Sequence, residues 1–126
     1  MNMVLAIAAG GAVGATFRHY ANMLALHFAG SGFPWGTLSV NIIGSFAMGV
    51  LITFFAHTGN PSPEVRGFLT VGLLGAFTTF STFSLDVATL WERGESFATM
   101  GYIMASVILS IAALFAGMML LRQLVV

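Results

Sequence analysis

A run of hydroxyl-bearing and aromatic residues interrupts a long apolar segment between residues 72 and 84. In a lipid bilayer every backbone N–H and C=O must be satisfied within the protein, so such an interruption has to pack in protein or line a wet cavity. Its free carbonyls can hold a cation, and the start of the next helix can hold an anion. We therefore predict a helix broken near residues 76–79, with one half ending near Gly75 and the other starting near Phe80. The alternative is an unbroken helix whose hydroxyls bond back to the preceding turn.

Two further sets of polar residues lie in apolar segments. Asn41 needs a hydrogen-bond partner there, and it is either an interhelical contact or an amide donor aimed at an ion path. Tyr102, Ser106 and Ser110 recur every four residues, which places one hydroxyl per turn on one helix face. Helix packing explains this stripe, and so does a hydrated track.

Phe80 and Phe83 are three residues apart and are therefore neighbours on a helix surface. A phenyl ring has a positive edge, which can touch a small dehydrated anion, although such a stripe is also typical of packing. The acid in this region, Asp86, is close enough to a helix end to reach water. Neutral donors with few carboxylates favour an anion over a cation. The predicted path residues are Asn41, Phe80, Ser81, Thr82, Phe83, Tyr102, Ser106 and Ser110.

Arg18 is the charged residue deepest within the first apolar segment. Gly10, Gly14 and Arg18 share one helix face, and the two glycines allow another helix to approach closely. An arginine at this depth is costly unless it extends to the interface, pairs, or faces water. Two interpretations of Arg18 stay open: its side chain extends to the membrane interface, or it lies in the vestibule at a pore mouth.

Composition places the chain in a membrane. Of its 126 residues, 58% are hydrophobic and 6% are charged, whereas about a quarter are charged in a soluble domain. We predict an all-α membrane protein, a single domain over residues 1–126 with four transmembrane helices at about 4–28, 37–57, 63–92 and 97–121. The third of these contains the predicted break.

The same composition excludes several function classes. The chain has no cysteine, so it has neither disulfides nor thiolate metal sites. Its four acids and three histidines form no cluster, and no hydrolase or P-loop motif is present, so we predict that it is not an enzyme. Four arginines without a basic run make nucleic acid an improbable partner. The N-terminus lacks the positive region of a signal peptide, so we expect the first apolar run to be retained.

The arginines give little preference for one orientation in the membrane. With this layout Arg66 and Arg122 lie on one side, and Arg18 and Arg93 lean to the other. We therefore predict insertion in both orientations and an antiparallel two-fold homodimer. So few helices also need a partner to enclose a polar path.

Three segments resemble the signatures of the Fluc (CrcB) fluoride channels: residues 75–84 (GAFTTFSTFS), 35–41 (WGTLSVN) and 11–18 (GAVGATFR). The likeness covers essentially the whole chain, including its length and helix layout. It implies a passive, fluoride-specific channel in the cell inner membrane that exports fluoride from the cytoplasm. It also implies a dual-topology antiparallel homodimer with two pores.

The resemblance further implies roles for individual residues. A structural sodium ion, which is not transported, would be held by the backbone carbonyls of Gly75 and Thr78. Asn41 would be the pore amide, and Arg18 would lie near the vestibule. Phe80 and Phe83 would contact fluoride, and Tyr102, Ser106 and Ser110 would form the polar track. Asp86 stands where many relatives are expected to carry glutamate.

Two other functions remain alternatives at this point. A small dual-topology multidrug or cation exporter needs a membrane-embedded acid, and the first helix has none. A non-transporting membrane scaffold would use the polar stripes only for helix packing. Fluoride efflux from loaded liposomes separates the three.

Overall fold

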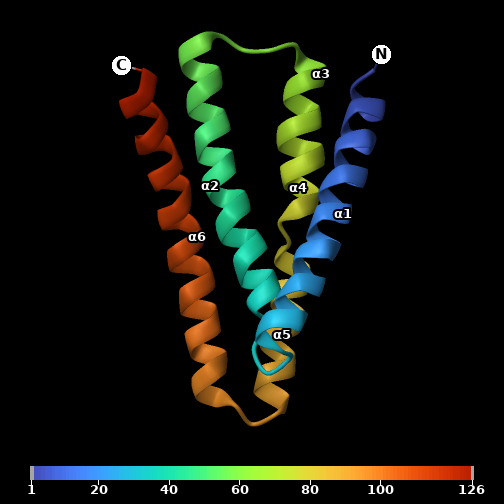
Figure 1. Ribbon diagram of the computed structural model, residues 1–126, viewed down its shortest axis with the longest axis vertical. Helices are drawn as coiled ribbons and strands as arrows, with labels where there is room; N and C mark the ends of the chain where they lie inside the picture. Colours follow the sequence, from blue (N-terminus) through green and yellow to red (C-terminus); the bar gives the residue numbers. More distant parts are fainter. Residues whose placement is uncertain (1, 126) are drawn as a thin grey trace.

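The computed structural model describes residues 2–125, which form helices joined by short connections (Figure 1). No strand occurs in this range, so the predicted all-α class is confirmed. The elements are α1 (Met3–Ala29), α2 (Trp35–Thr58), α3 (Pro63–Arg66), the π-helix η1 (Gly67–Leu74), α4 (Gly75–Phe77), α5 (Phe80–Glu92) and α6 (Ser96–Val125).

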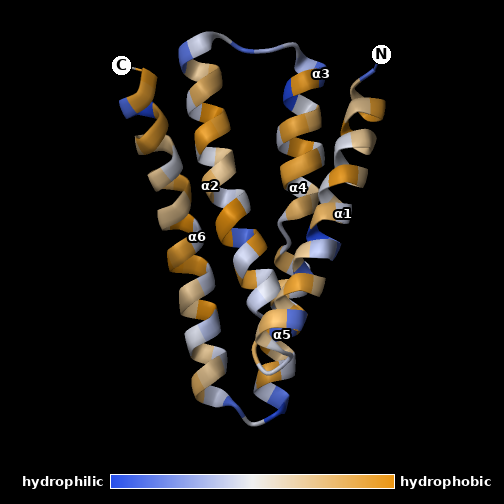
Figure 2. Ribbon diagram, viewed as in Figure 1, coloured by the Kyte–Doolittle hydropathy of each residue, from blue (hydrophilic) through white to orange (hydrophobic). Residues whose placement is uncertain are grey.

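The helices run alternately up and down along the long axis of the molecule (Figure 1). The two chain ends and the α2–α3 connection lie at one end, and the α1–α2 and α5–α6 connections lie at the other. Hydrophilic residues gather at these connections, while the helices between them are mainly hydrophobic (Figure 2). This distribution suits a bundle that crosses a bilayer, because the wet loops lie at both ends.

Within residues 2–125, three helical stretches are long and apolar enough to cross a membrane: Trp35–Thr58, Pro63–Glu92 and Ser96–Val125. The chain is therefore a multi-pass membrane protein by length and composition. α1 is not in this group, because Arg18, His19 and Asn22 lie in its second half. That α1 also crosses the membrane, as the fourth span, stays a prediction.

The third helical run is broken in the middle. Thr78 (φ −87°, ψ 160°) and Thr79 (φ −156°, ψ 124°) are extended, and α5 begins directly after them at Phe80. The predicted break is confirmed and the unbroken alternative is wrong. The first half continues to Phe77 instead of ending near Gly75, and most of it is π-helical, which the sequence did not predict.

Glycines bring the helices into backbone contact at two places. A Cβ at Gly14 would overlap the Leu73 carbonyl, so α1 lies directly against η1. A Cβ at Gly49 would overlap the Leu114 carbonyl, so α2 lies equally close to α6. These contacts hold the break against α1 and hold α6 opposite the break, which creates the site described next.

Candidate functional site

Asn41 of α2 clamps the broken segment through both ends of its amide. Its Nδ2 donates to the Thr79 carbonyl at 3.0 Å, and its Oδ1 accepts the Thr79 backbone N–H at 2.8 Å. An extended residue at membrane depth would otherwise leave both of its backbone groups unsatisfied. The clamp therefore allows the helix to be interrupted at this place. Among residues 2–125, one N–H of the Asn41 amide has no acceptor and is free for another.

The threonines of the break also bond locally. The Thr79 hydroxyl accepts the Thr82 backbone N–H at 3.1 Å as the N-cap of α5. The Thr78 hydroxyl donates to the Leu74 carbonyl at 2.9 Å. In a continuous helix, Thr79 N–H would donate to the Gly75 carbonyl and Thr82 N–H to the Thr78 carbonyl. Both carbonyls have lost those donors, and they are the two that the family resemblance implies as ligands of a sodium ion.

Arg18 of α1 approaches the break from the opposite side. Its Nε donates to the Ala76 carbonyl at 3.0 Å, and its Nη1 lies 3.5 Å from the Thr82 hydroxyl. The side chain is half-buried, and it extends to the break rather than to the end of α1. Arg18 thus contacts both halves of the interrupted helix.

A cleft of about 410 Å³ lies between α2, the break, α5 and α6, and we call it the central cleft. Its lining includes Asn41, Ser45, Thr78, Thr79, Phe80, Phe83, Ser106 and Ser110. The Ser106 and Ser110 hydroxyls are buried and have no hydrogen-bond partner among the described residues. They are donors that the fold itself leaves unused.

The two phenylalanines differ in their surroundings. Phe83 is 8% exposed, and its ring centroid lies 5.2 Å from that of Tyr102. Phe80 is 77% exposed, and its ring centroid lies 5.4 Å from that of Phe83. Phe83 is therefore a wall of the central cleft, whereas Phe80 projects from its rim.

Tyr102 is fully buried and does not share the surroundings of the two serines on its helix face. Its hydroxyl donates to Asp86 Oδ2 at 3.0 Å, and its ring packs edge-on against Phe33. Phe83 lies on its other side. Tyr102 is thus part of the partition between the central cleft and a second cleft nearer the end of the molecule.

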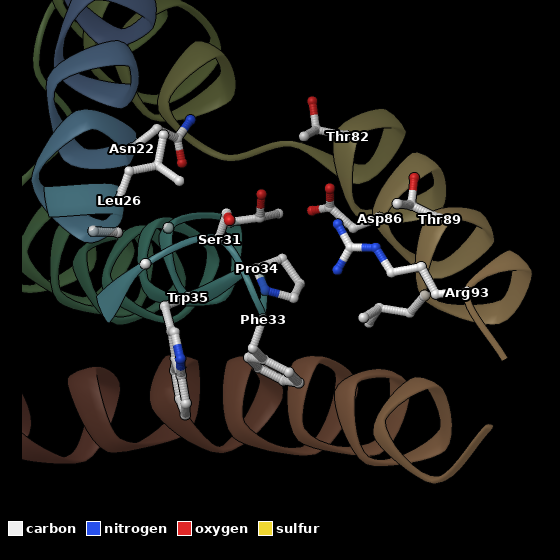
Figure 3. Close-up of a pocket in the computed structure, with 15 residues that line it drawn as sticks. Asn22, Leu26, Ser31, Phe33, Pro34, Trp35, Thr82, Asp86, Thr89 and Arg93 are labelled. Atoms are coloured by element: carbon white, nitrogen blue, oxygen red, sulfur yellow. The ribbon is translucent and has the colours of Figure 1, made fainter. Parts of the chain in front are cut away.

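This second cleft, the end cleft, has a volume of about 270 Å³ and lies between α1, the α1–α2 connection and α5 (Figure 3). Polar residues line it from three places: Asn22 on α1, Ser31 in the connection, and Thr82, Asp86 and Thr89 on α5 with Arg93 directly after that helix. Because it opens at a loop end and carries polar groups, it is suited to be water-filled. Asp86 lines the end cleft, and Tyr102, which donates a hydrogen bond to it, lies between this cleft and the central cleft.

Most of the predicted path residues are brought together around the two clefts. Asn41, Phe80, Phe83, Ser106 and Ser110 line the central cleft, whereas Thr82 lines the end cleft. The Ser81 side chain is exposed on α5, and its hydroxyl lies 3.4 Å from that of Thr79. The transport roles of all these residues stay predictions.

Sequence reasoning did not select several lining residues. Leu114 lies one turn beyond Ser110, so extending the four-residue spacing along α6 would have found it. Asn22 lies one turn beyond Arg18 and could have been found in the same way. Thr79 was recognised as part of the break, but no sequence signal indicates that Asn41 binds its backbone.

Comparison with known proteins gives a consistent result. Residues 5–118 match the model of the family described as "CrcB-like protein, Camphor Resistance (CrcB)". A protein named "Fluoride-specific ion channel FluC" from Rhodospirillum centenum is 53% identical over 122 residues, covering 97% of each chain. Proteins of the same name from Rhizobium meliloti and Agrobacterium fabrum are 49% and 51% identical, covering 99% and 94% of this chain. These matches include nearly the full length of the relatives as well.

Proposed function

The chain belongs to the CrcB family, and we propose that it is a fluoride-specific passive channel that exports fluoride from the cytoplasm across the cell inner membrane. The relatives carry the name of a channel, and this chain has their full length, so ion conduction and not enzymatic turnover is its activity. Export would keep fluoride away from enzymes that the anion inhibits.

The observation that carries the proposal is the unused hydrogen-bonding capacity of the central cleft. Within the described part of the chain, the Ser106 and Ser110 hydroxyls are buried without partners, and the Asn41 amide keeps one free N–H. Fluoride is small and strongly hydrated, so it leaves water only where several donors replace its hydration shell. Neutral donors bind it weakly enough that it can also leave, as conduction requires. The Phe83 ring of α5 lines the same cleft and adds a ring with a positive edge, which can touch a dehydrated anion.

We propose further that the channel is an antiparallel dual-topology homodimer with α1 as its fourth span and two pores. Phe80 supports this arrangement, because a ring 77% exposed at the rim of the central cleft would be covered by a second copy. Each copy would then contribute Phe83 to its own cleft and Phe80 toward that of its partner. The balanced arginines, with Arg66 and Arg93 at opposite ends, allow both orientations.

A structural sodium ion at the break is part of the same proposal. The Gly75 and Thr78 carbonyls fit it, because their helical donors are engaged elsewhere. Carbonyl oxygens are suitable ligands for a hard monovalent cation. Its charge would balance the negative end of the first half-helix and the paired carbonyls of two copies. The ion would be retained and not transported.

The channel is favoured over a small multidrug or cation exporter. An exporter of that kind needs a buried acid for proton exchange, and α1 contains neither aspartate nor glutamate. The family membership and the names of the relatives point the same way. A scaffold without transport would not need two partnerless hydroxyls in an open cleft.

Efflux from liposomes tests the proposal. Purified protein in vesicles loaded with fluoride should release it rapidly, while vesicles loaded with chloride should release almost none. Phe80→Ile and Asn41→Asp should abolish fluoride release, because the first removes a ring edge and the second replaces an N–H donor by a carboxylate. Chloride release as fast as fluoride release would exclude the selectivity that we propose.

The orientation is tested separately. Arg66→Cys, in a chain that otherwise has no cysteine, should react with an impermeant maleimide from both sides of the membrane. Reaction from one side only would exclude dual topology without affecting the proposed conduction.

A further inference from the structure

We infer that Arg18 is a positioning residue that decides which carbonyls of the break are free to bind a cation. Its Nε occupies the Ala76 carbonyl and its Nη1 reaches the Thr82 hydroxyl, so one side chain fixes both halves of the broken helix. This inference rests on the proposed cation site, because it concerns the oxygens that remain for that site.

The position of Arg18 follows from the glycine contact one turn earlier. Gly14 has no room for a Cβ against the Leu73 carbonyl, so the α1 backbone lies directly on η1 at that point. Arg18 is four residues later on the same face of α1, level with the end of the first half-helix. The close approach lets the guanidinium reach the last turn of α4 without leaving its helix face.

The carbonyls between Leu74 and Thr79 divide into two groups. Leu74, Ala76 and Thr79 each accept a hydrogen bond: Leu74 from Thr78, Ala76 from Arg18 and Thr79 from Asn41. For Gly75, Phe77 and Thr78 no donor is found among the described residues outside regular helix bonding. Side chains from α1 and α2 thus occupy the Ala76 and Thr79 carbonyls, Thr78 occupies that of Leu74, and a defined set of three is left.

The energetic role of Arg18 agrees with this division. Its hydrogen-bond partners among the described residues are neutral oxygens, and its charge lies at the negative end of the first half-helix, where a cation is stabilising. A guanidinium at this depth is costly to insert, so its contacts at the break have to offset that cost. Without Arg18, the Ala76 carbonyl would have no donor. Of the two side chains from other helices that hold the break, only Asn41 would then remain to fix the angle between α4 and α5.

Cation discrimination is the property that separates positioning from simple electrostatics. The positive charge of Arg18 repels sodium and potassium equally, so its removal by itself changes both affinities by the same factor. The number and geometry of carbonyl ligands, however, affect the two ions differently because of their sizes. The ratio of the two affinities therefore reports on the arrangement of the carbonyls.

The test uses the purified full-length protein in detergent, with sodium or potassium chloride exchanged against N-methyl-D-glucamine chloride at constant ionic strength. The thermal unfolding midpoint, titrated with each cation, gives the two half-saturating concentrations. Arg18→Met keeps the apolar stem and removes the donors. We expect this variant to lower the ratio of the potassium to the sodium half-saturating concentration about tenfold. Arg18→Lys should recover part of that ratio, because lysine can still donate to the Ala76 carbonyl. Arg122→Met, at the exposed end of α6, is the matched control and should leave the ratio unchanged.

Hydrogen exchange of the peptide covering residues 74–79 gives a second readout that needs no cation. It should be faster in Arg18→Met than in the parent, with α6 unchanged. An unaltered ratio together with unaltered exchange overturns the inference. If neither cation stabilises the parent protein, the proposed sodium site fails, and unaltered exchange in Arg18→Met would then remove the positioning role as well. Should Arg18→Met not fold, the same two measurements on Arg18→Lys and Arg18→Gln decide the question.

Discussion

The two walls of the central cleft use their polar groups in opposite ways. On the broken helix, the backbone N–H, the backbone carbonyl and the hydroxyl of Thr79 are all engaged in hydrogen bonds within the protein, the two backbone groups with the Asn41 amide of α2. On α6, the Ser106 and Ser110 hydroxyls face the same cleft without a partner. The first wall, which we call the engaged wall, is the break together with the Asn41 clamp, and these bonds hold it in one geometry. The second, which we call the open wall, is the Ser106–Ser110 face of α6, and it offers free donors to whatever enters.

The difference has an energetic meaning. A buried hydroxyl without a partner costs about 1–3 kcal/mol, and a serine in a helix can usually avoid that cost by bonding to the preceding turn. Ser106 and Ser110 do not make such bonds, whereas Thr78 on the opposite wall does. A fold that retains this cost in an open cleft is consistent with a site whose donors are completed by a ligand.

The largest effect is expected from breaking the engaged wall. Asn41→Ala leaves the Thr79 N–H and C=O without partners at membrane depth, and two such groups cost about 2–6 kcal/mol. We expect a marked fall in the thermal unfolding midpoint of the purified protein, and fluoride efflux at least about a hundredfold slower. The efflux loss alone corresponds to about 2.7 kcal/mol in the barrier.

The companion variant for this experiment is Asn41→Gln, which keeps the amide on a stem longer by one methylene. It should recover part of the stability and little of the efflux, because the clamp needs both atoms in place. An Asn41→Ala protein as stable as the parent would mean that the break does not depend on the clamp, and the contrast between the walls would then lose its basis.

The backbone contact that supports the engaged wall gives the next effect. Gly14→Ala puts a methyl group into the Leu73 carbonyl, which cannot rotate away, so α1 and η1 have to separate. Such overpacking costs about 1–3 kcal/mol. The unfolding midpoint should fall, and efflux should fall with it because the break moves. Gly11→Ala is the control, since nothing lies within 4 Å of its added Cβ and alanine favours the helix. Equal midpoints for the two variants would contradict the close contact.

The engaged wall was the easier one to predict from the sequence. A segment with two glycines and three threonines in an apolar run is locally unsuited to a lipid-facing helix, so residue type predicted the break, with an unbroken helix as the alternative. The partner of Asn41 did not follow, because an amide can bond to a helix, a loop or an ion, and only the packing of α2 on the break decides. The π-helical form of residues 67–74 likewise has no clear local signal.

The open wall was predicted only in part. The four-residue spacing correctly placed Ser106 and Ser110 on one face of α6, and both hydroxyls reach the central cleft. The same spacing grouped Tyr102 with them, yet that ring is buried between Phe33 and Phe83. Periodicity identifies a helix face, but which part of the face is covered depends on neighbouring helices. The packing of neighbouring helices also decides whether a hydroxyl is left without a partner.

The open wall should respond to mutation in function and hardly in stability. Ser106→Ala and Ser110→Ala remove hydroxyls that stabilise nothing in the fold, so the unfolding midpoint should stay the same or rise slightly. Fluoride efflux should slow about tenfold in each, or about 1.4 kcal/mol in the barrier. The matched comparison is Thr78→Val on the engaged wall, which removes a bonded hydroxyl and should lower the midpoint. Serine variants that unfold earlier but conduct normally would reverse the assignment of the two walls.

The smallest effect concerns a third buried hydroxyl without a partner, which lies away from both clefts. Thr53 of α2 is 4% exposed, and its Oγ1 makes no hydrogen bond with the described residues. Thr53→Val keeps the shape and removes the unsatisfied group, so we expect stabilisation by about 1 kcal/mol in thermal unfolding and unchanged fluoride efflux. This variant separates two explanations of the serines. If Thr53→Val slows efflux as much as Ser110→Ala does, loss of any buried hydroxyl affects the channel, and the position of the serines in the central cleft carries no special role. If efflux is unchanged, the free donors matter because of where they face.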